Sequence, residues 1–135
     1  MTGATHGNRR TPHSSNEPSK RLFRAAALIV AVTVAWLAFR PSTGVDVGLP
    51  WDKANHGFAF LVLTVLTGGG WPGLRALRMA AIILAAGVGI ELVQGLPAVG
   101  RDADLWDVVA DMVGFTLGRG VLMVARRRAW PGFRE

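Results

Sequence analysis

The sequence predicts an all-α integral membrane protein, a four-helix bundle with both termini in the cytoplasm. Two observations carry this prediction. Four long apolar segments follow one another in a chain of 135 residues, and the 15 Lys and Arg residues gather at alternate ends of those segments. About 20 apolar residues are enough for a helix to cross the hydrocarbon core of a bilayer. Four such segments leave little chain for a separate soluble domain, so one domain is expected.

The first elements are a tail and two helices. Segment 1–20 is rich in Thr, Ser, Asn and Pro, which predicts a disordered basic tail. The first spanning helix is expected over 22–39, and because no signal-peptide cleavage pattern follows it, we expect an uncleaved anchor. The second helix is expected over 54–70, where His56 is the single ionisable residue and a run of glycines forms the end.

The third helix is expected over 79–97 and stops at Pro97, because proline cannot continue a helix. The fourth is expected over 105–125, an apolar segment interrupted by a few charged residues. Together the four helices form a predicted transmembrane domain over 21–128. A short cytoplasmic tail, 129–135, follows it.

The distribution of basic residues sets the predicted orientation, since Lys and Arg accumulate on the cytoplasmic side of membrane proteins. Nearly all of them lie in the N-terminal tail, the second connection and the C-terminal end. The exceptions are Arg40, Lys53 and Arg101. The net charge of +6 therefore reflects topology, and no nucleic-acid partner is expected. The absence of cysteine excludes disulfides and thiolate chemistry.

Polar residues within or beside the apolar helices are the candidate functional residues, because an ionisable group at membrane depth is costly and usually faces a partner inside the bundle. By helix rise, Glu91 and Asp111 lie about 18 Å and about 21 Å from the cytoplasmic end, so they are expected to meet in the outer third of the membrane. The candidates for ligand binding are Asp52, Lys53, His56, Glu91, Gln94, Arg101, Asp104, Asp107 and Asp111. Gly87, Gly114 and Gly118 are expected to let helices approach closely.

Three blocks of this sequence resemble the VanZ-like family of small bacterial membrane proteins. The blocks are W-D-K-A-N-H-G-F-A-F-L at 51–61, E-L-V-Q at 91–94 and G-R-D-A-D-L-W-D-V-V-A-D-M-V-G-F-T-L-G at 100–118. The family pattern is D-K-x-x-H-x-x-x-F, then E-x-x-Q, then R-x-x-D-x-x-D-x-x-x-N-x-x-G-x-x-x-G. The matched positions are Asp52, Lys53, His56, Phe60, Glu91, Gln94, Arg101, Asp104, Asp107, Gly114 and Gly118.

The chain departs from the family pattern at Asp111, where the family has Asn. An ionised carboxylate only accepts hydrogen bonds, so a role that needs amide donation at this position is not expected here. The resemblance implies a multi-pass protein of the bacterial plasma membrane. It also implies an association with envelope lipids or cell-wall precursors and with resistance to the glycopeptide teicoplanin, although most members have no assigned biochemical activity.

Three hypotheses for the polar residues remain open. In the first, Lys53 and Arg101 grip the phosphate or carboxylate headgroup of a membrane lipid or a lipid-linked cell-wall precursor, and other polar residues bond the rest of it. This hypothesis needs no cofactor. The residues expected to bond the remaining headgroup atoms are His56, Glu91 and Asp107.

The second hypothesis is an acid/base or metal-assisted hydrolase or transferase that acts on a lipid-linked substrate. The sequence lacks a G-x-S-x-G nucleophile motif, which favours a protein that is not an enzyme. The metal-ligand candidates would be His56, Glu91, Asp107 and Asp111. The third hypothesis is a structural network that only fixes the helix register. In that network Lys53 and Arg101 would pair with Asp104 and Asp107, and His56 would bond Glu91.

Overall fold

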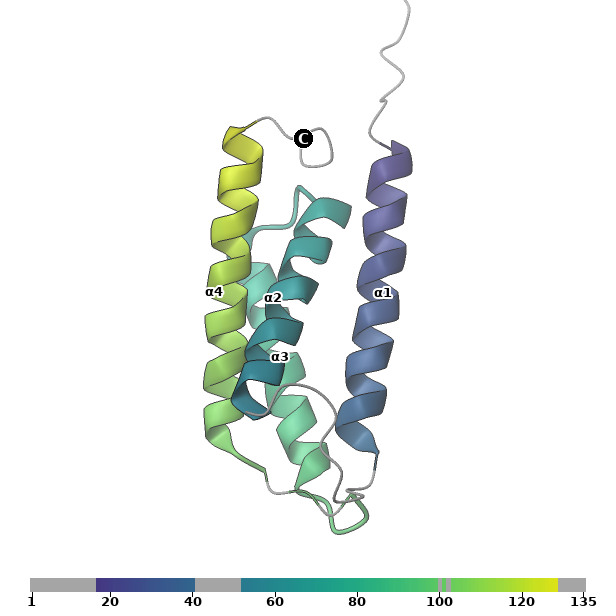
Figure 1. The fold of residues 1–135 in the computed structure, drawn as a ribbon, viewed down its shortest axis with the longest axis vertical. Helices are drawn as coiled ribbons and strands as arrows, with labels where there is room; N and C mark the ends of the chain where they lie inside the picture. The colour runs from purple at the N-terminus through teal and green to yellow at the C-terminus, as the bar shows by residue number, and fades with distance from the viewer. Residues whose placement is uncertain (1–16, 41–51, 100, 102, 129–135) are drawn as a thin grey trace, which may run out of the picture.

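The computed structural model describes residues 17–40, 52–99, 101 and 103–128, and these residues form four helices and no strand. The helices are α1 (Glu17–Phe39), α2 (Asp52–Gly70), α3 (Ala76–Gln94) and α4 (Leu105–Arg127). Consecutive helices run in opposite directions (Figure 1). The start of α1 and the end of α4 therefore lie at the same end of the bundle, which we call the basic end. The opposite end, where α2 and α4 begin, is called the polar end.

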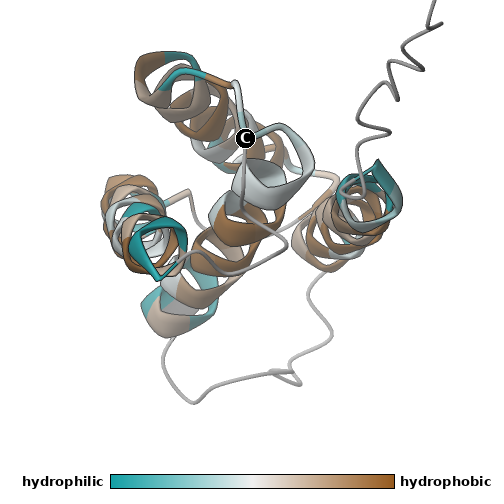
Figure 2. Cartoon of the chain, turned by 90° about the horizontal axis from the view of Figure 1, so that it is seen from above, coloured by the Kyte–Doolittle hydropathy of each residue, from teal (hydrophilic) through white to brown (hydrophobic). Residues whose placement is uncertain are grey.

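The surface of the helices is apolar in the way that a membrane protein requires. Among the described helices, α1, α3 and α4 are long and apolar enough to cross a membrane. Large apolar side chains such as Ile29, Leu77 and Val113 are exposed on them. Hydrophobic residues, drawn in brown, recur along the helices (Figure 2). Since soluble monomers rarely expose large continuous apolar areas, the chain is an all-α membrane protein.

Helix α2 differs from the other three, so among the described helices the expectation of four membrane-spanning helices is met for α1, α3 and α4. Its first turns carry Asp52, Lys53, Asn55 and His56, which interrupt the apolar stretch that a spanning helix needs. Among its described side chains, 53–70, Phe58 alone is exposed. Because its neighbours α1 and α4 cover it, α2 can carry polar residues that a lipid-facing helix could not.

Five helix boundaries differ from those predicted. Three of the differences are small: α2 begins at Asp52, α3 begins at Ala76 and α4 ends at Arg127. Helix α1 begins at Glu17, so residues 17–20 are helical and do not belong to the tail. An acidic residue in the first turn complements the helix dipole, and Pro18 is tolerated there because the first N–H groups have no intrahelical partner. Helix α3 runs over Ala76–Gln94, and the Gly95 N–H donates to the Glu91 carbonyl at 3.0 Å. The predicted end at Pro97 is too late, because the residue before a proline disfavours the helical conformation.

The remainder of the N-terminal tail, 1–16, and the C-terminal tail, 129–135, lie outside the described residues.

Glycines set the distances between the helices around the site. A Cβ atom on Gly114 of α4 would collide with the carbonyl oxygen of Gly57 on α2, and Gly118 is similarly close to α2. A Cβ atom on Gly87 of α3 would collide with the Asp111 carboxylate of α4. The three glycines predicted to serve helix packing therefore lie at helix contacts. Their positions bring the polar faces of α2, α3 and α4 together.

Candidate functional site

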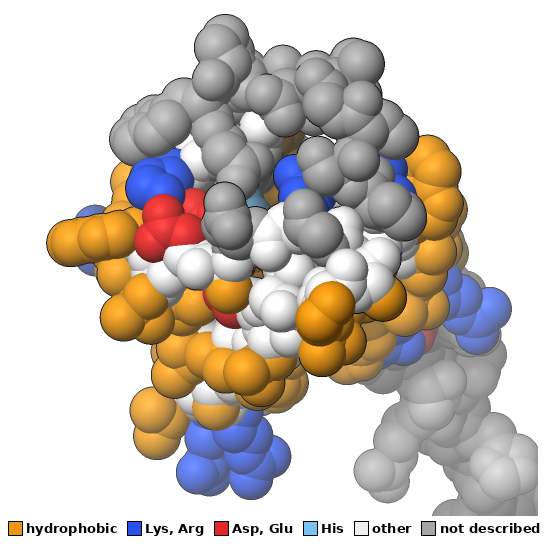
Figure 3. Space-filling model, turned by 90° about the horizontal axis from the view of Figure 1, so that it is seen from below, with side chains coloured by type: hydrophobic (Ala, Val, Ile, Leu, Met, Phe, Trp, Pro, Cys, Tyr) orange, Lys and Arg blue, Asp and Glu red, His pale blue; other side chains and the backbone are white. Residues whose placement is uncertain are grey.

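Six ionisable side chains converge at the polar end, and we call them the polar cluster. They come from the first turns of α2, the last turn of α3 and the start of α4. Figure 3 shows this end of the molecule, where side chains of both charges lie beside hydrophobic ones. The members of the polar cluster are Lys53, His56, Glu91, Asp104, Asp107 and Asp111.

Lys53 ties the start of α2 to the start of α4. Its ammonium group donates to the Asp104 carboxylate and, at 3.2 Å, to Oδ1 of Asp107. Asp104 is also the N-cap of α4, where its Oδ1 accepts from the Trp106 N–H at 2.9 Å. The bond from Lys53, followed by the bond from Trp106, holds the pKa of Asp104 below its usual value. Asp104 is therefore an ionised cap that also carries an ion pair.

His56 lies between two buried carboxylates of α4. Its Nδ1 is 3.1 Å from Oδ1 of Asp111, and its Nε2 is 3.8 Å from Oδ2 of Asp107. Asp107 and Asp111 are four residues apart, so a helix places them on one face, and His56 follows Lys53 by three residues on the facing side of α2. The polar stripe of α2 thus matches the acidic stripe of α4 in register.

Glu91 is the member of the polar cluster that α3 contributes. Its Oε2 accepts from the Asp104 backbone N–H at 2.6 Å. Its Oε1 is buried without a hydrogen-bond partner among the described residues, as is Oδ2 of Asp111. One ligand atom from each of Glu91, His56 and Asp107 lies within 4.8 Å of the others. Three helices therefore each contribute one nitrogen or oxygen atom to the same small region.

Two predicted ligand-binding residues donate hydrogen bonds to the end of α1. Arg101 Nη1 donates to the Leu37 carbonyl at 3.2 Å, and Gln94 Nε2 donates to the Ala38 carbonyl at 3.4 Å. The last carbonyls of a helix have no intrahelical partner, so these bonds cap α1 and attach it to the site. The expected pairing of Arg101 with the aspartates is not among the described ion pairs.

The other expected pairings have mixed outcomes. Lys53 pairs with Asp104 and Asp107, as the structural hypothesis predicted. The described carboxylate contacts of His56 are with Asp111 and Asp107, whereas that hypothesis predicted Glu91. Asp52 begins α2, and its side chain lies outside the described part of the chain.

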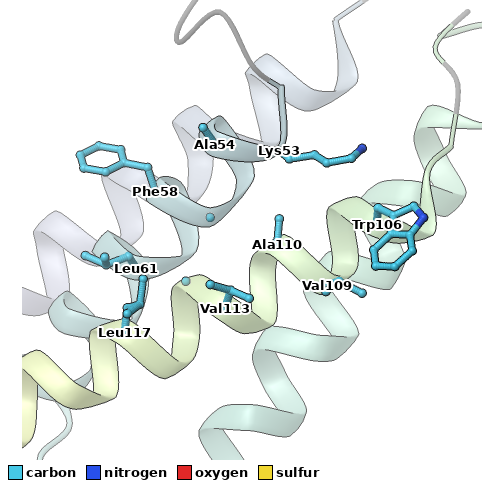
Figure 4. A pocket seen from close by; sticks show the side chains of 11 residues that line it. Lys53, Ala54, Phe58, Leu61, Trp106, Val109, Ala110, Val113 and Leu117 are labelled. Carbon is cyan, nitrogen blue, oxygen red and sulfur yellow. The ribbon is translucent and has the colours of Figure 1, made fainter.

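An apolar groove of about 470 Å³ lies between α2 and α4 and was not predicted from the sequence. Lys53 and Trp106 lie at one end of the groove, and Leu61 and Leu117 lie at the other (Figure 4). Small residues of both helices line this space, beside the point where Gly114 contacts Gly57. Facing small residues were the available signal, but the rotation of each helix decides which of them face each other. These small lining residues are Ala54, Gly57, Ala110 and Gly114.

No family model, curated protein or solved structure matches this chain. The resemblance to VanZ-like proteins therefore stays a prediction that rests on the three sequence blocks. The candidate site is defined by its own geometry: a buried polar cluster that is continuous, through Lys53, with an apolar groove.

Proposed function

We propose that this protein is a multi-pass membrane protein that binds a phosphate-bearing envelope lipid. A hydrocarbon chain would lie in the groove between α2 and α4, and the headgroup would lie at the polar cluster. The observation that supports this proposal is the position of Lys53, which lines the apolar groove and also belongs to the polar cluster.

The dimensions of the groove suit one lipid chain. Along α4 it extends from Trp106 to Leu117, which is about 16 Å at the rise of an α-helix. This length is about half of a hydrocarbon core of roughly 30 Å, the depth of one leaflet. Trp106 is exposed at the end near Lys53, and indole rings favour the level of the headgroups. The groove would therefore receive a chain whose headgroup lies beside Lys53.

The chemistry of the polar cluster suits the headgroup. The Lys53 side chain is 30% exposed and presents a compact positive charge to a phosphate. Asp104, its most exposed partner in the polar cluster, can release the ammonium group because ion pairs near water are weak. Carboxylates of the polar cluster would then accept hydrogen bonds from headgroup hydroxyl or ammonium groups. Arg101 holds α1 and is not needed for this contact.

The predicted topology places the polar end at the outer face of the bacterial plasma membrane, where a cell-wall precursor would also be bound. An effect on susceptibility to teicoplanin-type glycopeptides is supported by the VanZ-like resemblance alone. Comparing the inhibitory concentration of teicoplanin for cells with the wild-type chain and with a Lys53→Met chain would test that link.

The lipid proposal can be tested by native mass spectrometry of the full chain in mild detergent with added phosphatidylglycerol. Val113→Trp fills the groove, and Lys53→Met removes the charge at its end. Both variants are expected to lower the lipid-bound fraction several-fold. Val121→Trp makes the same substitution at an exposed position of α4 outside the groove and is the matched control.

The control separates the groove from the general surface of the helix. If Val113→Trp holds as much lipid as the wild type, or if Val121→Trp loses as much as Val113→Trp, lipid does not occupy this groove. Far-UV circular dichroism of each variant checks that the helices are retained.

A further inference from the structure

We propose that the polar cluster is also a binding site for one divalent transition-metal cation, with His56, Glu91 and Asp107 as its ligands. These residues come from α2, α3 and α4, so the cation would join three helices at the polar end. The proposal does not depend on lipid binding, because the ligand atoms lie in the bundle interior and not in the groove.

The distances fit one shared ion better than direct bonds between the side chains. Nε2 of His56 and Oδ2 of Asp107 are 3.8 Å apart, which is too long for a hydrogen bond. With the Glu91 oxygen included, all three ligand atoms lie within 4.8 Å of one another. Two ligands of one ion at bond lengths of about 2.0–2.6 Å can be separated by up to about 4–5 Å.

The buried Glu91 carboxylate is an independent sign of a missing partner. Glu91 is 7% exposed, and its Oε1 has no hydrogen-bond partner among the described residues. A buried carboxylate oxygen normally has a donor, a metal or a proton beside it. The polar cluster also has more carboxylates than basic groups, since Lys53 is its single ammonium. A cation would neutralise this excess in a region where water cannot.

Asp111 supplies the support that a histidine ligand needs. Its Oδ1 is 3.1 Å from Nδ1 of His56, and an ionised carboxylate at this distance holds the ring proton on Nδ1, which makes Nε2, 3.8 Å from Asp107, the ligand atom. A carboxylate raises the basicity of the imidazole more than an amide would. The aspartate at this position, where VanZ-like proteins have Asn, therefore favours metal binding in this chain.

The set of ligands indicates the class of metal. One imidazole with two carboxylates suits borderline ions such as Zn²⁺ or Mn²⁺ better than Ca²⁺ or Mg²⁺, which prefer oxygen ligands alone. Lys53 opposes binding, because its ammonium group is 3.2 Å from Oδ1 of Asp107. Replacement of Lys53 by Met should consequently strengthen metal binding, whereas it should weaken lipid binding. This opposite response separates the two proposals experimentally.

The test uses the full chain, purified in detergent and stripped of metal with a chelator. His6 and His13 are first replaced by Gln, so that His56 is the one histidine left. Titration calorimetry with Zn²⁺ and with Mn²⁺ is expected to give about one bound ion per chain. Glu91→Gln should weaken binding at least about tenfold. Glu17→Gln makes the same chemical change at the basic end and should leave binding unchanged.

The proposal is overturned by a chain that binds neither ion, or by a Glu91→Gln variant that binds as tightly as its parent. If Glu91→Gln does not fold, zinc-edge X-ray absorption of the zinc-bound parent chain tests whether His56 is a ligand. One imidazole and oxygen ligands are expected in that spectrum. A spectrum without an imidazole contribution would show that His56 is not a ligand.

Discussion

Replacing Gly114 by Ala is the most direct test of the packing that builds this site. The new methyl group would collide with the carbonyl oxygen of Gly57 and lie 3.0 Å from the backbone nitrogen of Leu61. Both neighbours are backbone atoms, so no side chain can rotate away, and α4 must move from α2. Overpacking of this kind costs about 1–3 kcal/mol.

A second glycine of the same helix supplies the matched control. A Cβ atom at Gly120 would meet no described atom within 4 Å. Replacing glycine by alanine inside a helix stabilises it by roughly 1 kcal/mol, and this contribution is common to both variants. The difference in unfolding free energy between Gly114→Ala and Gly120→Ala therefore isolates the steric cost, about 1–3 kcal/mol in favour of the Gly120 variant.

Unfolding of both variants can be followed by far-UV circular dichroism in mixed micelles, with increasing amounts of a denaturing detergent. Equal stability of Gly114→Ala and Gly120→Ala would refute the close approach of α2 and α4. The positions of the groove and of His56 would then lose their structural basis, because both follow from that approach.

Two further predictions concern the ion pair and the topology. Because the pKa of Asp104 is depressed, its contribution to stability is present above its ordinary pKa and is lost as the pH falls through the depressed value. Asp104→Asn should flatten the acid side of a plot of melting temperature against pH, and an unchanged plot would contradict the role of the ion pair. For the topology, single cysteines at positions 46 and 102 should react with an impermeant label on intact cells. Cysteines at 13 and 132 should react after permeabilisation, and the reverse pattern would invert the orientation.

Much of the fold could be predicted from local sequence. The positions of α2 and α4 follow from apolar stretches bounded by polar residues, and the predicted and observed ranges differ by a few residues. The early start of α1 at Glu17 was missed because a polar first turn resembles a tail. The polar first turns of α2 were present in the sequence, but the enclosure of this helix by α1 and α4, which makes Lys53 and His56 tolerable, depends on contacts between helices.

Six of the nine predicted ligand-binding residues form the polar cluster, whereas their pairing could be predicted only in part. Spacing of three and four residues placed His56, Asp107 and Asp111 on inward faces, and all three belong to the polar cluster. Spacing could not assign Arg101 to the Leu37 carbonyl, since the end of α1 is brought to it by tertiary packing. The groove was missed for the same reason.

The sequence by itself determined that this chain forms apolar helices with costly polar residues near one end, because helix formation and hydropathy depend on neighbours within a few turns. Only the tertiary structure decided which polar atoms meet. The rotation of each helix about its axis, fixed by contacts such as that of Gly114 with Gly57, places His56 between Asp107 and Asp111 and leaves Oε1 of Glu91 without a described hydrogen-bond partner. Those contacts join residues far apart in the chain, and no local pattern encodes them.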